Sequence, residues 1–204
     1  MPSLGNQTAV LVGNGPSATS WRAGALIDSF DLVVRFNHFR TDGYEPWVGT
    51  KTDIWVINGP RYRLEDGAPQ VRLLYSVPLP LIDDDLRYLA ALRRLGARVS
   101  VLDETVLDHV KTEFRRSCLT TRRGLPYPST GVIAAHLLLA DVSVLYLHGF
   151  DFMQSGVHHY YEPRRRQELV GWHDPGAEAS FFAKLVDQGR VRALRPSTRP
   201  STAA

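Results

Sequence analysis

The sequence contains one cysteine, Cys118, among its 204 residues, so it cannot form an internal disulfide. It also has no run approaching the ~20 consecutive apolar residues that span a membrane. The N-terminus lacks the charged region and long apolar run of a secretory signal peptide. From these absences we expect a protein of the reducing cytoplasm, and we interpret it as bacterial.

Charge of one sign is not in large excess, because the formal net charge is only +3. The arginines nevertheless gather in short clusters that would suit an acidic substrate, an anionic membrane surface or nucleic acid. These clusters are Arg93-Arg94, Arg115-Arg116, Arg122-Arg123 and Arg164-Arg165-Arg166. Such runs are most often solvated surfaces, and the chain lacks the aromatic platform motif of an RNA-binding domain. We therefore expect no nucleic-acid partner and keep peripheral membrane contact as an open role for the arginines.

The composition, 44% hydrophobic, is sufficient for a real core, and we expect one domain over residues 1–195 with a disordered tail at residues 196–204. Short apolar runs alternate with helical patterns along the chain. The predicted strands are Ala9 to Val12, Leu32 to Phe36, Ile54 to Ile57, Val71 to Val77, Val99 to Leu102 and Val142 to Leu147. The predicted helices are Trp21 to Ile27, Asp84 to Leu95, Glu104 to Arg116, Gly131 to Leu139 and Pro175 to Val186. This alternation predicts an α/β fold, a single Rossmann-like domain with a mostly parallel sheet and helices on both faces.

Ligands of such sheets bind beyond the carboxyl ends of the strands, so the residues after each strand are the first candidates. The first strand ends in the turn GNGPS at residues 13–17, whose Asn14 and Ser17 can bind phosphate or ribose. The third glycine of the dinucleotide fingerprint is missing from this turn. The second strand ends in Asn37, where a dinucleotide-binding enzyme would place a carboxylate, so we do not expect a nicotinamide cofactor.

Two later segments add candidates of the same kind. Ser129 at the start of a predicted helix is first of all an N-cap, but with Thr130 and Gly131 it also offers a site for a carboxylate or phosphate. After the sixth predicted strand, Asp151 can accept from a ribose or a base. Phe152 can cover a nucleobase or, equally, pack in the core.

The segment His159-Tyr160-Tyr161-Glu162, followed by His173 and Glu178, is the most informative part of the sequence. Imidazoles exchange protons near pH 7, and phenol hydroxyls donate to oxyanions. These residue types therefore indicate a site that moves protons and holds an anionic leaving group. An inert surface loop is the alternative for any one of them.

The sequence contains one candidate metal motif. Asp83, Asp84 and Asp85 resemble the Asp-x-Asp that binds a divalent cation in many nucleotide-sugar transferases. These acids immediately precede a predicted helix, whose N-terminus favours negative charge, and we interpret them as a helix start. His136 and His148 are interpreted as packed or hydrogen-bonded residues. We expect no metal and no cofactor.

Taken in chain order, these segments resemble the motifs of the sialyltransferases that use CMP-sugars, glycosyltransferase families 29 and 42. The segments that resemble the large sialylmotif are residues 10–17, 30–37 and 48–53, and those that resemble the small one run from residue 128 to residue 152. Residues 159–162 match the third motif, and His173 with Glu178 matches the H-x4-E of the very small motif. The turn at residues 15–17 has the family 42 form, whereas the two histidine segments look like family 29. The disulfide that animal members carry between the two large motifs cannot form in a chain with one cysteine.

The resemblance implies a GT-A-like variant of the fold and assigns most candidates to the donor. The implied donor-binding residues are Asn14, Ser17, Asn37, Ser129, Thr130, Gly131, Asp151, Phe152, Tyr160 and Tyr161. His159, with one of the two tyrosines, would donate to the leaving phosphate. His173 would deprotonate the acceptor hydroxyl, and Glu178 would orient the site.

The function implied is an inverting, metal-independent transfer of a 2-keto sugar acid, sialic acid or Kdo, from its CMP-activated donor. The acceptor would be a hydroxyl of a saccharide or glycolipid. Expulsion of CMP builds negative charge on phosphate and positive charge on the sugar, so donors to phosphate and one base are sufficient. The alternative is a catalytically inactive nucleotide-binding module in glycan assembly.

Overall fold

The computed structural model describes residues 7–58, 72–75, 83–94, 98–117, 127–152, 154, 156–157, 159–162 and 173–196. Within them, seven strands form one sheet in the order β5-β4-β3-β2-β1-β6-β7, and every neighbouring pair is parallel. The strands are β1 (Ala9–Val12), β2 (Leu32–Phe36), β3 (Ile54–Ile57), β4 (Arg72–Tyr75), β5 (Arg98–Val101), β6 (Leu145–His148) and β7 (Val191–Ala193). The predicted parallel α/β sheet is confirmed.

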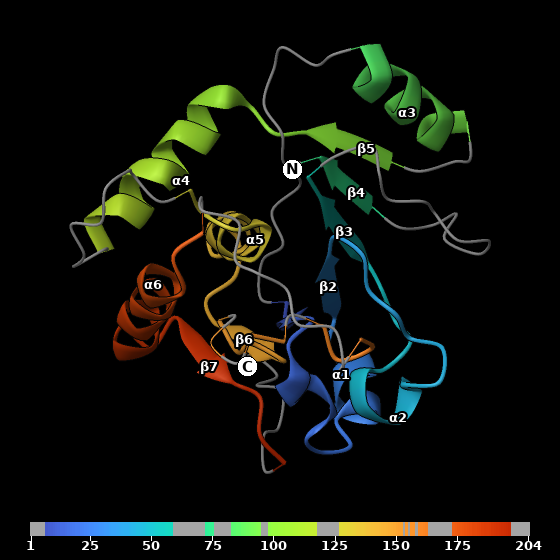
Figure 1. Ribbon diagram of the computed structural model, residues 1–204, viewed down its shortest axis with the longest axis vertical. Helices are drawn as coiled ribbons and strands as arrows, with labels where there is room; N and C mark the ends of the chain where they lie inside the picture. Colours follow the sequence, from blue (N-terminus) through green and yellow to red (C-terminus); the bar gives the residue numbers. More distant parts are fainter. Residues whose placement is uncertain are drawn as a thin grey trace.

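Helices cover both faces of this sheet (Figure 1). The helical elements are the 3-10 helix η1 (Pro16–Thr19), α1 (Gly24–Asp28), α2 (Glu45–Val48), α3 (Asp83–Arg94), α4 (Glu104–Ser117), α5 (Thr130–Leu138) and α6 (Pro175–Asp187). Successive residues of a strand point to opposite faces. Leu11 of β1 therefore packs in the core under α4, α5 and α6, while Val10 and Val12 pack in the core formed with η1, α1 and α2.

The two helices that open at the candidate site have clear N-terminal signals. Ser129 caps α5 by accepting from the N–H of Val132. Asp174 caps α6 by accepting from the N–H groups of Gly176 and Ala177, and Pro175 occupies the first helical position, where no N–H is needed. Local sequence chemistry thus determines where both helices begin.

The predicted elements agree with the structure within a few residues, and three short elements were not predicted. The missed elements are η1, α2 and β7. Asp83, Asp84 and Asp85 form the first residues of α3, as the helix-start interpretation expects. The arginine pairs at residues 93–94 and 115–116 lie in the last turns of α3 and α4, where cations are favourable. Both remaining arginine clusters, and the predicted tail except Pro196, lie outside the described residues.

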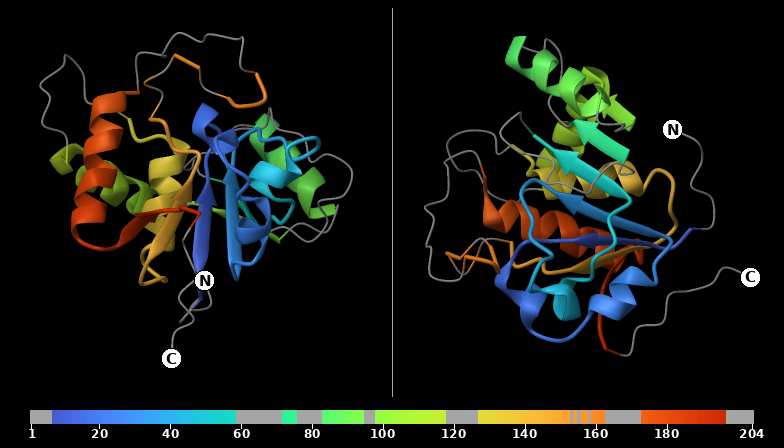
Figure 2. Two further views of the ribbon diagram at one scale, coloured as in Figure 1. Left: turned by 90° about the horizontal axis from the view of Figure 1, so that it is seen from below. Right: turned by 90° about the vertical axis from the view of Figure 1, so that its right-hand side faces the viewer.

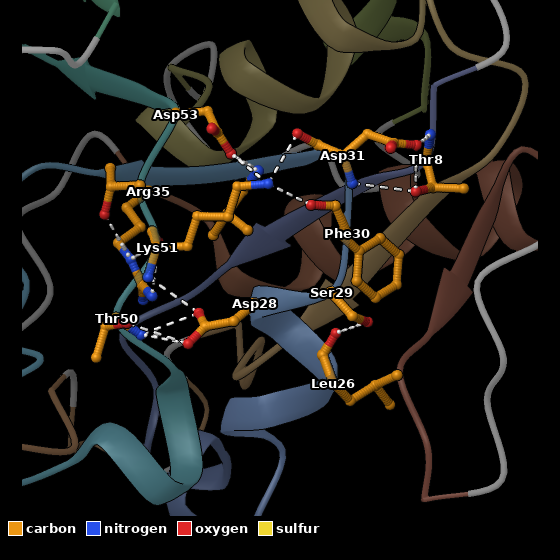
Figure 3. A network of polar contacts seen from close by, with 12 residues as sticks. Thr8, Leu26, Asp28, Ser29, Phe30, Asp31, Arg35, Thr50, Lys51 and Asp53 are labelled. Atoms are coloured by element: carbon orange, nitrogen blue, oxygen red, sulfur yellow. Dashed lines mark hydrogen bonds and ion pairs between the residues drawn. The ribbon is translucent and has the colours of Figure 1, made fainter.

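Charged residues at the end of α1 and just before β3 fasten the segment before β3 to α1 and β2 at the amino edge of the sheet (Figure 3). The Asp28 carboxylate accepts from the N–H groups of Thr50 and Lys51, each at 2.9 Å. The Asp53 carboxylate accepts from the N–H of Val33 at 2.7 Å and lies 3.4 Å from the Lys51 ammonium. These residues therefore organise the scaffold at the edge opposite the carboxyl ends of the strands.

Arg35 in the middle of β2 has a similar structural role. Its side chain is fully buried, and its guanidinium donates to the carbonyl oxygen of Val48 at 2.7 Å and to the Thr52 hydroxyl at 3.0 Å. Burial lowers the pKa of Arg35 to about 10, so the side chain stays charged at neutral pH. Among the described residues, no helix is long and apolar enough to cross a bilayer.

Candidate functional site

The site residues converge where the strand order reverses. The chain places β2 to β5 on one side of β1 and β6 with β7 on the other, so the boundary between β1 and β6 is the switch point at which open α/β sheets bind ligands. Because α5 and α6 lead back into β6 and β7, their N-termini lie at the same carboxyl edge. Figure 2 shows the segment after β6, in orange, beyond the arrowheads of the strands.

Asn14 joins the turn after β1 to the turn after β2. Its side chain is buried, and its Nδ2 donates to the carbonyl oxygens of Phe36 at 3.2 Å and His38 at 2.9 Å. The amide is thus used to hold residues 36–38 in place. Asn14 supports the site through the backbone that it positions.

Asn37 presents an unsatisfied polar atom to the site. Its backbone is left-handed, with φ of 52°, a conformation that asparagine tolerates better than most residues. Its Nδ2 donates to the Thr130 hydroxyl at 3.2 Å, and Trp55 donates its indole N–H to the Asn37 carbonyl oxygen at 2.7 Å. Its Oδ1 is buried and has no hydrogen-bond partner in the described part of the chain. A buried acceptor without a partner is costly, and a ligand donor would satisfy it.

Ser129 and Glu178 couple the starts of α5 and α6. The Ser129 hydroxyl accepts from the N–H of Val132 at 3.3 Å and donates to Oε2 of Glu178 at 2.9 Å. Glu178 is only 4% exposed, and its Oε1 has no hydrogen-bond partner among the described residues. Burial raises the pKa of Glu178 to about 7, although the hydrogen bond from Ser129 opposes the shift.

His173 lies immediately before the N-cap of α6. Its Nδ1 is 3.3 Å from the carbonyl oxygen of Tyr127 and 3.9 Å from Oε1 of Glu178. A carbonyl oxygen can only accept, so Nδ1 carries the proton and Nε2 carries the lone pair of the neutral ring. This tautomer leaves Nε2 as the basic nitrogen.

The turn at residues 159–162 is fastened to the segment after β2. Tyr160 is buried, its N–H donates to the carbonyl oxygen of Asn14 at 2.8 Å, and its hydroxyl donates to the carbonyl oxygen of Arg40. The Tyr161 hydroxyl donates to the carbonyl oxygen of His38 at 3.0 Å. We predicted that one of these phenols donates to the leaving phosphate, but the structure directs both hydroxyls to backbone oxygens.

Two contacts within the described turn position His159. Its Nδ1 lies 3.5 Å from a carboxylate oxygen of Glu162, and its ring stacks on Tyr161 with centroids 5.0 Å apart and an interplanar angle of 9°. The arrangement suits a residue that donates a hydrogen bond to an anion.

Ser17, Asp151 and Phe152 lie beside this edge and make contacts within the protein. Oδ2 of Asp151 accepts from the N–H of Ser17 at 2.9 Å. A Cβ atom on Gly15 would come within 2.1 Å of the same oxygen and within 2.8 Å of the backbone carbonyl oxygen of Gly149, so this turn requires glycine. The Phe152 ring contacts Phe182 with centroids 5.5 Å apart and packs against the core. The described contacts of the Asp151 and Phe152 side chains are therefore structural, and Ser17 takes part through its backbone N–H.

The two histidines predicted to be packed or hydrogen-bonded differ in position: His148 ends β6 at the carboxyl edge, whereas His136 lies in α5, away from this edge. His148 is buried, with Nε2 2.8 Å from the carbonyl oxygen of Ala18, and burial lowers its pKa. His136 borders a recess of about 270 Å³ at the C-terminal ends of α4, α5 and α6, and burial lowers its pKa as well. Since α5 and α6 lead into β6 and β7, this recess lies at the amino edge, remote from the candidate site. No group of three metal-ligating side chains occurs within the described ranges.

The family model of glycosyltransferase family 29 (sialyltransferase) matches residues 3–190. The chain belongs to glycosyltransferase family 29. It is 26% identical over 212 residues to the human CMP-N-acetylneuraminate-beta-galactosamide-alpha-2,3-sialyltransferase 1, covering 95% of this chain and 60% of the relative. It is also 26% identical to the type 2 lactosamine alpha-2,3-sialyltransferase of Mus musculus, covering 89% of this chain and 63% of that protein. This family 29 chain thus spans about 60% of the length of such relatives.

Solved structures of two sialyltransferases share the fold. A mammalian sialyltransferase superposes with a TM-score of 0.73 at 22% identity, covering 93% of this chain and 69% of that one. The Campylobacter jejuni sialyltransferase CstII in complex with cytidine-5'-monophosphate superposes with a TM-score of 0.58 at 16% identity, covering 95% and 82% of the two chains. The predicted GT-A-like sialyltransferase fold is confirmed for this family 29 chain.

Two residues that contact the candidate site of this family 29 chain were not predicted. Tyr127 supplies the backbone carbonyl that orients His173, and His38 contacts Tyr161. A backbone contact leaves no signal in side-chain chemistry, so Tyr127 was not detectable. His38 directly follows the candidate Asn37, and this adjacency was the available signal.

Proposed function

We propose that this chain transfers a 2-keto sugar acid, sialic acid or Kdo, from its CMP-activated donor to a saccharide hydroxyl, with inversion and without a metal ion. Family 29 membership supports the reaction class. The human relative is named for CMP-N-acetylneuraminate, which favours sialic acid as the sugar. The proposal rests mainly on one observation: His173, Glu178 and Ser129 contact one another at the starts of α5 and α6, beside Asn37.

The nucleotide side of the site uses Asn37 and the start of α5. The buried Oδ1 of Asn37 would accept from a ribose hydroxyl or the cytosine amino group, both of which cytidine offers. The N–H groups of Thr130 and Gly131 belong to the first turn of α5 and have no intrahelical acceptor. They would hold an anionic group of the donor, the phosphate or the sugar carboxylate.

In the proposed reaction the acceptor hydroxyl oxygen attacks the anomeric carbon from the face opposite CMP. The bond from that carbon to the phosphate oxygen breaks, and CMP leaves with both bonding electrons. His173 takes the hydroxyl proton on Nε2, because Nδ1 is already protonated against Tyr127. The Glu178 carboxylate, 3.9 Å from Nδ1, would stabilise the resulting imidazolium. Inversion follows from a single displacement with base and leaving group on opposite faces.

His159 would stabilise the departing phosphate. Its contact with Glu162 positions the ring, and the hydrogen bonds from Tyr160 and Tyr161 to the backbone fix the turn that carries it. A positioned donor aimed at developing charge is worth several kcal/mol of transition-state stabilisation, roughly 10² to 10³ in rate.

The deciding experiment incubates the purified chain with CMP-N-acetylneuraminate or CMP-Kdo and follows CMP release with and without a β-galactoside. Acceptor-dependent CMP release supports transfer and identifies the sugar. His173→Ala is the matched control for background hydrolysis. Tight CMP binding without any release would favour the inactive nucleotide-binding module.

A further inference from the structure

His38 is an exposed histidine at the carboxyl edge that the proposed mechanism leaves without a role. It directly follows Asn37, and its ring lies edge-on to Tyr161 with centroids 5.3 Å apart. Tyr161 in turn stacks on His159, with centroids 5.0 Å apart. Tyr161 thus contacts both His38 and His159, the residue assigned to the leaving group.

The contacts of the Tyr161 hydroxyl determine which nitrogen of His38 carries a proton. This hydroxyl is 3.0 Å from the His38 carbonyl oxygen and 3.2 Å from Nδ1 of the same residue. A phenol has one proton, and the carbonyl oxygen can only accept, so the phenol donates to the carbonyl. Nδ1 must then donate to the phenol oxygen. In the neutral ring, Nε2 is consequently the acceptor.

The position of Nε2 of His38 limits the kinds of group that it can bind. Nε2 of His38 makes no hydrogen bond within the described part of the chain, and the ring is open to solvent beside Asn37. A neutral imidazole with a free lone pair accepts from hydroxyl groups, which are the most abundant donors on a sugar. Donor and acceptor sugars both carry such hydroxyls.

We propose that His38 is a further substrate-contacting residue, which accepts a hydrogen bond from a sugar hydroxyl through Nε2. This inference rests on the proposed transferase function. Tyr161 is its positioning residue, because the phenol sets the tautomer of His38. The turn at residues 159–162 thereby serves both the leaving group, through His159, and the sugar, through His38.

The test compares His38→Gln, which keeps an acceptor, with His38→Lys, which offers only donors and a charge, and with His38→Ala. Measurements are made at pH 8, above the ordinary pKa of histidine. We expect His38→Ala and His38→Lys to lower kcat/KM by about 3- to 10-fold, the usual effect of one lost neutral hydrogen bond, with His38→Gln close to wild type. A rise in KM for the CMP-sugar identifies a donor hydroxyl, and a rise in KM for the saccharide identifies an acceptor hydroxyl.

Two results would overturn the proposal. If His38→Lys keeps full activity while His38→Gln loses it, His38 binds an anion instead. If all three variants match wild type and the control His109→Gln, an exposed histidine on α4, then His38 contacts no substrate. CMP release by the wild-type chain is measured as a separate control. If the wild-type chain releases no CMP, the proposed function itself is refuted.

A spectroscopic measurement tests the tautomer independently of activity. Histidine ¹⁵N shifts should show a protonated Nδ1 and an unprotonated Nε2 for His38 at pH 8. Tyr161→Phe removes the hydroxyl and should shift His38 toward the tautomer protonated on Nε2, which is usual for a free imidazole. A wild-type spectrum with Nε2 protonated would contradict the assignment.

Discussion

Replacing Glu178 with glutamine removes a buried ionisable group while keeping its shape, and the structure gives both the sign and the size of the effect. Burial raises the pKa of this carboxyl from 4.5 to about 7. Each pH unit of such a difference is worth about 1.4 kcal/mol, so the full effect is about 3 kcal/mol. The N-termini of α5 and α6 favour the carboxylate, but by only about 0.3–1 kcal/mol each, so burial prevails.

The sign follows from proton binding. Between pH 4.5 and about 7 the folded protein keeps the Glu178 proton that the unfolded chain has lost. The free energy of unfolding therefore falls as pH rises through this window and is constant, for this group, above it. Glu178→Gln has no such proton, so its stability relative to wild type should rise by about 3 kcal/mol from pH 4.5 to pH 8.

Urea unfolding of wild type and Glu178→Gln at several values between pH 4.5 and pH 8 measures this difference. Glu104→Gln is the matched control, because Glu104 also lies in the first turn of a helix but is exposed. The stability of Glu104→Gln should differ from wild type by at most about 1 kcal/mol over this pH range, because only the interaction of an exposed carboxylate with a helix N-terminus is lost. A difference between wild type and Glu178→Gln that does not change with pH would refute the reasoning. At pH 8 we expect the variant to be more stable but slower, since it lacks the carboxylate beside His173.

Four further predictions concern the proposed reaction. His173→Ala should lower kcat by ~10² to 10⁴ with little change in CMP affinity, measured by calorimetry, and near-normal turnover would remove His173 from the mechanism. His159→Ala should lose less activity with a donor whose leaving group is better, and equal losses would leave His159 only a role in shaping its turn. EDTA should leave activity unchanged, whereas loss with rescue by Mn²⁺ or Mg²⁺ would restore Asp83 to Asp85 as candidate ligands. Asn37→Ala should weaken CMP binding by about 10-fold, because it removes the buried acceptor, and unchanged affinity would place the nucleotide elsewhere.

Local patterns in the sequence were sufficient to predict the layers of the fold. Buried parallel strands need apolar residues on both faces, and Ala9–Val12 and Ile54–Ile57 show them directly. The caps Ser129 and Asp174 are equally local, because each side chain bonds to N–H groups two or three residues away. The strand β7 was missed because it has three residues, of which only Val191 is buried.

The placing of each candidate at a carboxyl edge was also predictable, since it depends only on where a strand or helix begins and ends. Asn14, Asn37 and Ser129 lie where their positions in the sequence predict. What each side chain does there was not predictable. Asn14 bonds to backbone 22 and 24 residues away, and the Tyr160 hydroxyl reaches backbone 120 residues away.

The sequence by itself therefore determined the element types, the sheet class and the edge that carries the site, because these follow from short-range periodicity and capping. Only the tertiary structure decided that two phenols fasten a turn, that Glu178 is buried between two helix starts, and that Tyr127 orients His173. Burial and long-range hydrogen bonds depend on segments that meet only after folding. The same residue types can therefore bind a substrate or hold the backbone, and the choice is made by what packs against them.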